Sequence, residues 1–69
     1  MTLGDYRRRL SWTQRELAKR TNLDYNTVRK AESGETVSAR TALAIAEALS
    51  KALGERVLIE DIDGLNVAL

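Results

Sequence analysis

The chain has 69 residues, enough for one small domain with a single core. It contains no cysteine and no histidine, which excludes disulfides, thiolate metal sites and histidine acid–base chemistry. No nucleophile with a partnering base is visible, so we expect a protein that is not an enzyme and needs no cofactor or metal. There is no apolar run long enough to span a bilayer and no signal-peptide pattern, so we expect a cytoplasmic, nucleoid-associated protein without a membrane partner.

The net charge of +1 hides an uneven distribution of charged residues. Residues 1–30 contain eight basic and three acidic residues, whereas residues 31–69 contain three basic and seven acidic ones. A basic half of this kind indicates a polyanionic partner.

The first helix is expected to begin after Thr2, whose hydroxyl can cap it. Asp5 at the third helical position is favoured by the positive end of the helix, and Gly4 weakens the first turn. The helix should end at Ser11 and Trp12. Its buried residues recur at three- and four-residue steps: Leu3, Tyr6 and Leu10.

A second helix is expected after Thr13, which forms with Glu16 the S/T-x-x-E pattern of a capping box. Trp12 before the cap and Leu17 after it have the spacing of a hydrophobic staple. The helix should end at Asn22, because asparagine tolerates the left-handed backbone conformation that ends many helices.

A third helix follows, with Asp24 as its expected cap and Gly34 at its end. Val28 and Ala31 form its buried side. Two capped helices joined by a turn of three or four residues make a helix-turn-helix. Polar residues lie on or beside the outward face of the third helix: Tyr25, Asn26, Thr27, Arg29, Lys30 and Ser33.

The longest helix is expected to start at Ser38 and to end at Gly54. Its alanines favour helix and allow neighbouring helices to approach closely. The apolar residues at helical spacing are Ala42, Ile45, Ala46, Leu49 and Leu53.

The segment 55–69 is expected to add one more helical turn from Glu60, after the apolar run 57–59. Val67 and Leu69 should be exposed in a monomer. This apolar tail either packs on the fourth helix or forms a dimer contact. The predicted fold is therefore all-α: a compact bundle of about five short helices, with a DNA-binding domain over 1–54 and a C-terminal segment over 55–69.

The outward face of the third helix carries the groups needed to read DNA bases. Asparagine can pair with adenine, and arginine or lysine can donate to guanine. A polar helix face that only meets water is the alternative. The two capped helices, the short turn and the basic half of the chain together favour DNA binding.

The segment Thr13–Glu32 resembles the helix-turn-helix of the lambdoid phage repressor and Cro family, also called the XRE family. The match runs without a gap through TQ-x-ELA-x-(K/R), an aliphatic residue at Leu23, then Val28 and Glu32-x-Gly34. It covers roughly residues 2–54, and this spacing is a specific signal for a DNA-binding domain.

The resemblance implies that residues 24–33 are a recognition helix in the major groove. The base-reading residues would be Tyr25, Asn26, Arg29 and Lys30. The residues on the DNA backbone would be Thr13, Gln14, Arg15, Thr27 and Arg40. An ion pair would hold the recognition helix to the first helix as a structural lock, formed by Arg7 and Glu32.

The same resemblance implies a transcriptional regulator, a repressor that binds a palindromic operator in double-stranded DNA as a homodimer. Three features depart from the family pattern: Asn22 replaces the usual glycine, Asp24 brings a carboxylate near phosphate, and residues 37–38 lack basic side chains. The alternative function is a protein-interaction module, such as an antitoxin or adaptor whose acidic C-terminal half binds a partner protein.

Overall fold

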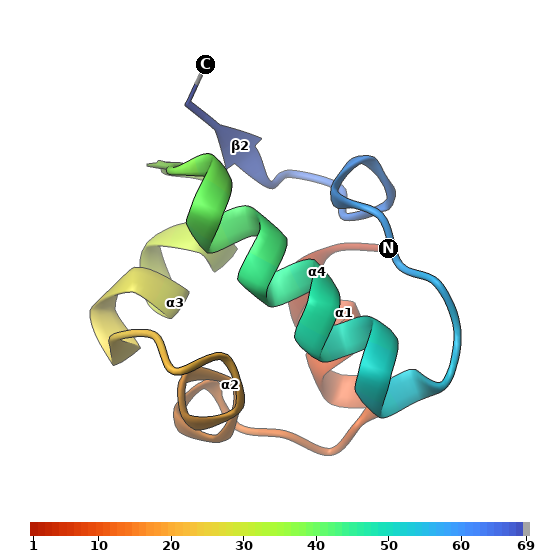
Figure 1. Ribbon diagram of the computed structural model, residues 1–69. Coiled ribbons are helices and arrows are strands. Elements are labelled where there is room, and N and C mark those ends of the chain that lie inside the picture. The colour runs from red at the N-terminus through yellow and green to blue at the C-terminus, as the bar shows by residue number, and fades with distance from the viewer. Residues whose placement is uncertain (69) are drawn as a thin grey trace.

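In the computed structural model, which describes residues 1–68, four α-helices surround one core and a short tail closes over them (Figure 1). The elements in chain order are α1 (Leu3–Arg9), α2 (Gln14–Thr21), α3 (Tyr25–Glu32), β1 (Thr36–Val37), α4 (Ala39–Leu53), the 3-10 turn η1 (Ile59–Asp61) and β2 (Asn66–Val67). None of the helices in residues 1–68 has the length and apolar character needed to cross a bilayer.

The core forms around α2, which packs against both α3 and α4. Ile45 and Leu49 of α4, Leu17 of α2 and Val28 of α3 are its largest fully buried side chains. Full burial of one such side chain stabilises the fold by about 1.5–3 kcal/mol relative to leaving it in water. The buried residues predicted for α2, α3 and α4 are thus confirmed, except that Leu53 of α4 is only partly buried.

The helix starts follow the predicted capping residues with two corrections. Thr2 and Asp5 form a complete capping box, and Ser38 accepts a hydrogen bond from the N–H of Thr41 at 3.1 Å. Thr13 accepts from the N–H of Glu16 at 3.0 Å, but the Glu16 carboxylate binds Arg20 instead of completing the box.

Asp24 gives the second correction. It has the extended backbone of an N-cap residue, but its side chain makes no capping hydrogen bond and remains in solvent.

The Asp5 carboxylate is held in its ionised form by the start of α1. The N–H of Thr2, the guanidinium of Arg8 and the hydroxyl of Thr2 keep the pKa of Asp5 below its ordinary value.

Three helices end in the same way, with one residue in the left-handed conformation: Ser11 at φ 57°, Asn22 at φ 58° and Gly34 at φ 89°. In each case the next N–H bonds to a carbonyl five residues earlier, at 3.0 Å. This is the Schellman arrangement. Asn22 was predicted in this role, whereas Ser11 was not.

Replacing Ser11 with glycine is expected to raise the free energy of unfolding by about 0.5–1 kcal/mol. Glycine removes the steric cost of a Cβ at φ 57°, although its greater freedom in the unfolded chain offsets part of the gain. Urea unfolding with an unchanged m-value measures the difference. Ser11→Ala is the control, because alanine keeps the Cβ. An equal gain from alanine would show that the backbone conformation is not the cause.

The prediction of an all-α bundle of five helices is wrong in two respects. Ile59–Asp61 forms only one 3-10 turn. The Asp61 carboxylate accepts from the N–H of Leu58 at 2.9 Å at the start of this turn, and the backbone of Ile62 is already extended. The N–H of Asp63 donates to the carbonyl of Met1 at 2.8 Å, which carries the chain alongside the N-terminus.

The second difference is a two-stranded parallel sheet. β1 pairs with β2 in the register Thr36 with Asn66 and Val37 with Val67. The N–H of Ala68 extends this pairing to the carbonyl of Val37 at 2.8 Å. Val67 is therefore partly buried and not exposed as predicted, while Leu69 lies outside the described residues.

The tail packs on the rest of the chain. Val57 and Ile62 are 5% and 3% exposed and belong to the same core cluster as the helices. The N–H of Val57 donates to the Ser50 hydroxyl of α4 at 2.8 Å, and that hydroxyl has the carbonyls of Ala46 at 2.8 Å and Val57 at 3.1 Å as acceptors. Residues 55–68 thus share one core with residues 1–54.

Candidate nucleic-acid interface

Burial on one side of α3 fixes which side faces outward. Val28 and Ala31 are 0% and 2% exposed, so the side chains on the opposite surface of the helix point to solvent. The start of α2 lies beside that surface. We call the combined surface the α2–α3 face, formed by Gln14, Arg15, Tyr25, Asn26, Arg29 and Lys30.

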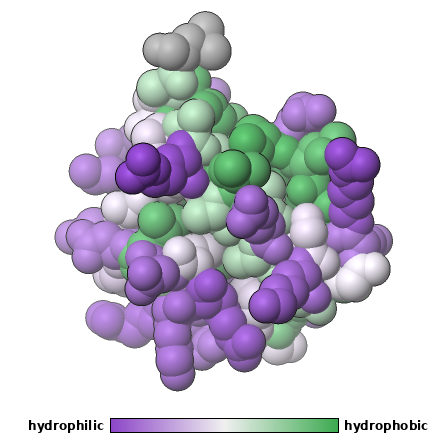
Figure 2. Space-filling model, in the orientation of Figure 1, coloured by the Kyte–Doolittle hydropathy of each residue, from purple (hydrophilic) through white to green (hydrophobic). Residues whose placement is uncertain are grey.

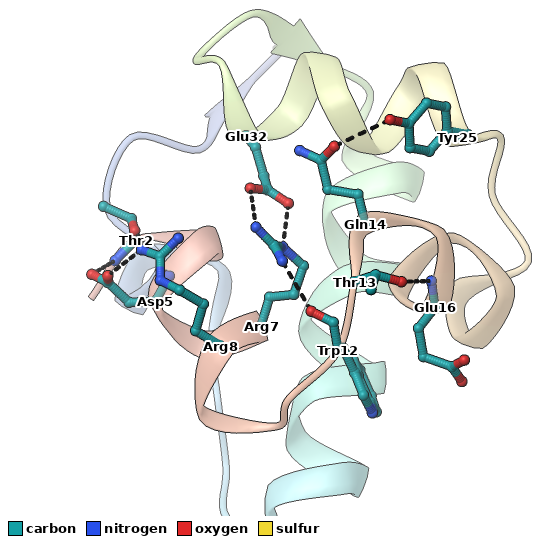
Figure 3. A network of polar contacts seen from close by, with 10 residues as sticks. All are labelled: Thr2, Asp5, Arg7, Arg8, Trp12, Thr13, Gln14, Glu16, Tyr25 and Glu32. Carbon is teal, nitrogen blue, oxygen red and sulfur yellow. Dashed lines mark hydrogen bonds and ion pairs between the residues drawn. The ribbon is translucent and has the colours of Figure 1, made fainter.

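Tyr25 connects the two helices of this face. Its hydroxyl hydrogen-bonds to Oε1 of Gln14 at 3.5 Å (Figure 3). The guanidinium carbons of Arg15 and Arg29 lie 4.5 and 5.9 Å from the centre of its ring, so both cations can interact with the aromatic face. Arg29 also donates to Oδ1 of Asn26 at 3.5 Å.

An open polar hollow of about 580 Å³ lies between the start of α2 and the outward surface of α3. Its lining includes the amides of Gln14 and Asn26 and the cations of Arg29 and Lys30. Glu35, at one edge of the hollow, accepts from the Ser33 hydroxyl at 3.2 Å. Donors and acceptors for hydrogen bonding are thus both present.

The structure brings Arg7 and Glu32 together (Figure 3). Nε and Nη2 of Arg7 donate to the two carboxylate oxygens of Glu32 at 2.8 and 3.3 Å, and Nη1 donates to the carbonyl of Trp12 at 2.9 Å. The side chains are 16% and 13% exposed. One guanidinium therefore joins α1, the end of α3 and the α1–α2 connection.

Gly4 lies against this ion pair. A Cβ at residue 4 would be 3.3 Å from Oε1 of Glu32 and 3.2 Å from the guanidinium of Arg8. The absence of a side chain thus lets the carboxylate approach α1, which gives a packing reason for a residue that weakens the helix.

Basic residues divide into two groups. Four arginines have carboxylate partners within 3.2 Å: Arg7 with Glu32, Arg8 with Asp5, Arg9 with Glu55 and Arg20 with Glu16. Among residues 1–68, no carboxylate lies within 4.0 Å of the side-chain nitrogens of the other group: Arg15, Lys19, Arg29, Lys30, Arg40, Lys51 and Arg56. Four of these seven are on α2 and α3, so positive charge without a partner is concentrated there.

The remaining predicted DNA-backbone residues lie around or apart from this face. Thr13 and Arg15 border a second hollow of about 420 Å³ together with Tyr25. Thr27 is half-buried beside the outward surface of α3. Arg40 is exposed in the first turn of α4, and no hydrogen bond or ion pair described for residues 1–68 joins it to the α2–α3 face.

Sequence reasoning missed two sets of contacts in this region. The carbonyl of Trp12 binds Arg7 because Ser11 turns the chain in the left-handed conformation. The packing of Arg15 and Arg29 around Tyr25 depends on the angle between α2 and α3. Neither contact has a spacing signal in the sequence.

A model of the helix-turn-helix family matches residues 3–56, which is most of the chain. Comparisons with curated proteins and with solved structures gave no match. The family match agrees with the cap, turn and burial pattern of α2 and α3 and confirms the resemblance of the segment Thr13–Glu32. The chain therefore belongs to the helix-turn-helix family of lambda-repressor- and Cro-like domains, the XRE family, and is a DNA-binding transcriptional regulator.

Proposed function

We propose that the chain binds specific sites in double-stranded DNA, with α3 in the major groove, and represses transcription from a palindromic operator as a homodimer. The observation that carries this proposal is the outward surface of α3. It offers Asn26, Arg29 and Lys30 opposite the buried Val28, and neither cation has a carboxylate partner among residues 1–68. A helix of this kind fits the major groove.

Base reading is assigned to four side chains. Asn26 can pair with N6 and N7 of adenine, and Arg29 and Lys30 can donate to O6 and N7 of guanine. Tyr25 lies at the start of α3, where the ring steadies Arg29 and its edge can contact a base or a thymine methyl group. The hydrogen bond from Arg29 to Asn26 holds these two base-reading side chains next to each other.

The DNA backbone is assigned to the start of α2 and to flanking residues. Thr13, Gln14 and Arg15 lie at the N-terminal end of α2, where the helix dipole favours phosphate. Thr27 and Arg40 would extend the contacts on either side. Asp24 opposes them, because its exposed carboxylate repels phosphate.

The homodimer and repression belong to the same proposal. Two recognition helices enter successive major grooves about 34 Å apart when two subunits are related by a two-fold axis, so the operator is palindromic. Occupancy of a promoter by the dimer blocks access to the DNA, which is the simplest regulatory outcome.

The charge of residues 31–69 favours a second candidate function. This part of the chain has seven acidic and three basic residues, which suits an antitoxin or adaptor that binds a basic partner protein. Such a role is compatible with DNA binding through the basic half.

Selection of bound sequences from random duplex DNA tests the proposed function. We expect a palindromic consensus with half-sites about 10–11 base pairs apart, centre to centre. Affinity for that consensus should fall with salt, and Arg15→Ala should reduce the slope of log affinity against log salt by about one. Absence of an enriched sequence, together with no binding at low salt, would favour the protein-interaction module.

A further inference from the structure

An apolar groove of about 570 Å³ runs between α4 and the tail, with residues from both sides in its lining. Three large apolar side chains of residues 1–68 are exposed by more than a third, and two of them, Leu43 at 52% and Leu58 at 38%, line this groove. Figure 2 shows hydrophobic surface gathered between α4 and the tail around η1. We call it the α4–tail groove, and its apolar and small residues are Leu43, Ala46, Ser50, Val57, Leu58 and Ile59.

The charges at the edge of the groove cancel. α4 contributes Glu47 and Lys51, one helical turn apart, and the tail contributes Arg56 and Glu60. Among residues 1–68 none of these four has a partner of opposite charge within 4.0 Å. A neutral edge with both signs fits neither DNA nor a strongly basic protein. It is complementary to a surface with the same mixture of charges.

We propose that the α4–tail groove is the dimer interface of the chain. Two copies of the chain would pack against each other through this same surface. In a two-fold interface, residue i of one subunit meets residue j of the other, and j meets i. Two α4 helices packed antiparallel then place Glu47 opposite Lys51 of the second copy, twice. If the two-fold axis crossed α4 half a helical turn earlier, Glu47 would lie opposite Glu47 of the second copy. Repulsion between the two like charges disfavours that arrangement.

The size and chemistry of the groove suit this arrangement. Ala46 and Ser50 are small enough for the helices to approach closely, and Leu43 of each copy can enter the groove of the other. Burial of the exposed leucines removes apolar surface from water, which drives association.

The groove is also placed so that DNA binding remains possible. Its lining comes from α4 and residues 56–60 and shares no residue with the α2–α3 face. A second copy bound at the groove would therefore leave the α2–α3 face of each copy uncovered, as binding of both recognition helices to DNA requires.

The proposal adds an interface to the homodimer of the proposed function, and it is tested without DNA. Sedimentation equilibrium of the wild-type chain over a range of concentrations should show a monomer–dimer equilibrium. Glu47→Lys and Lys51→Glu each bring like charges together twice, and each should raise the dimer dissociation constant about tenfold or more. The double variant E47K/K51E restores opposite charges and should return the constant to within about threefold of wild type.

Two further variants separate the groove from general effects on α4. Leu43→Glu should abolish the dimer, because it places a charge in the apolar contact. Ala52→Glu adds the same charge at an exposed α4 position outside the groove lining and should leave the dimer unchanged. Urea unfolding of every variant shows whether the monomer remains folded.

The proposal would be overturned if the wild-type chain stayed monomeric. It would also be overturned if the dimer dissociation constant of the double variant stayed as high as those of the single variants. Failure of the proposed function is distinguishable, because it affects affinity for DNA and not the sedimentation of the free protein. The wild type and E47K/K51E have the same net charge, so their affinities for one half-site should be equal.

Discussion

Replacing Arg7 with alanine is expected to lower the free energy of unfolding by about 3 kcal/mol. The substitution removes three hydrogen bonds and leaves the Glu32 carboxylate, 13% exposed, without its partner. A partly buried carboxylate has lost part of its hydration, and without Arg7 no ion pair compensates for that loss. This is a large fraction of the stability of a domain of this size.

A double-mutant cycle isolates the interaction between Arg7 and Glu32. Glu32→Ala should also lower the free energy of unfolding. The loss in the double variant should be smaller than the sum of the losses in the two single variants by about 1–3 kcal/mol. Arg7→Lys should not restore stability, because an ammonium cannot bind both carboxylate oxygens and the Trp12 carbonyl in the same geometry.

The pair Arg8 and Asp5 is the matched control for this cycle. Its side chains are 65% and 44% exposed, so water screens the interaction and we expect a coupling of no more than about 0.5 kcal/mol. Additive losses for Arg7 and Glu32 would show that the two residues contribute separately and that no lock exists.

The second large effect is expected on DNA. Asn26→Ala or Arg29→Ala should weaken binding to the selected site by about 1–3 kcal/mol, roughly 5- to 150-fold, while affinity for random duplex DNA changes little. The reason is that base contacts are lost only where the matching base is present. Fluorescence anisotropy with the two DNAs at one salt concentration gives both affinities.

Arg20→Ala is the matched control for Arg29→Ala. Both variants lose one positive charge from the helix-turn-helix, but Arg20 is already paired with Glu16 at 2.7 Å and lies over the ring of Trp12. We expect the control variant to lower the affinity for the selected site and for random DNA slightly and equally. Equal losses on both DNAs for Asn26→Ala and Arg29→Ala would remove these residues from base reading.

Signals that act over a few residues allowed much of the helical fold to be predicted. The caps at Thr2 and Ser38 and the break at Asn22 depend on hydrogen bonds and backbone preferences within one helical turn. The buried sides of α2, α3 and α4 follow from helical periodicity, because burial of apolar residues selects one face. These signals also fixed which surface of α3 faces outward.

The features that were not predicted depend on residues far apart in the sequence. β1 and β2 have two residues each, too few to show a periodic pattern, and they pair across the length of α4. The helical turn expected from Glu60 is cut short by contacts with the N-terminus. In the candidate site, the position of Tyr25 between two arginines follows from packing and not from spacing.

The parallel pairing of β1 with β2 also imposes an order on the assembly of the chain. Parallel strands cannot be joined by a tight hairpin, so the segment between Thr36 and Asn66 must fold as α4 and return before the strands meet. Helices form from contacts close in sequence, whereas this pairing closes a long loop at an entropic cost. The helix-turn-helix can thus be in place before the tail docks, and the α4–tail groove is completed only afterwards. We therefore expect the α2–α3 face to form before the α4–tail groove, because the groove also needs residues 56–60.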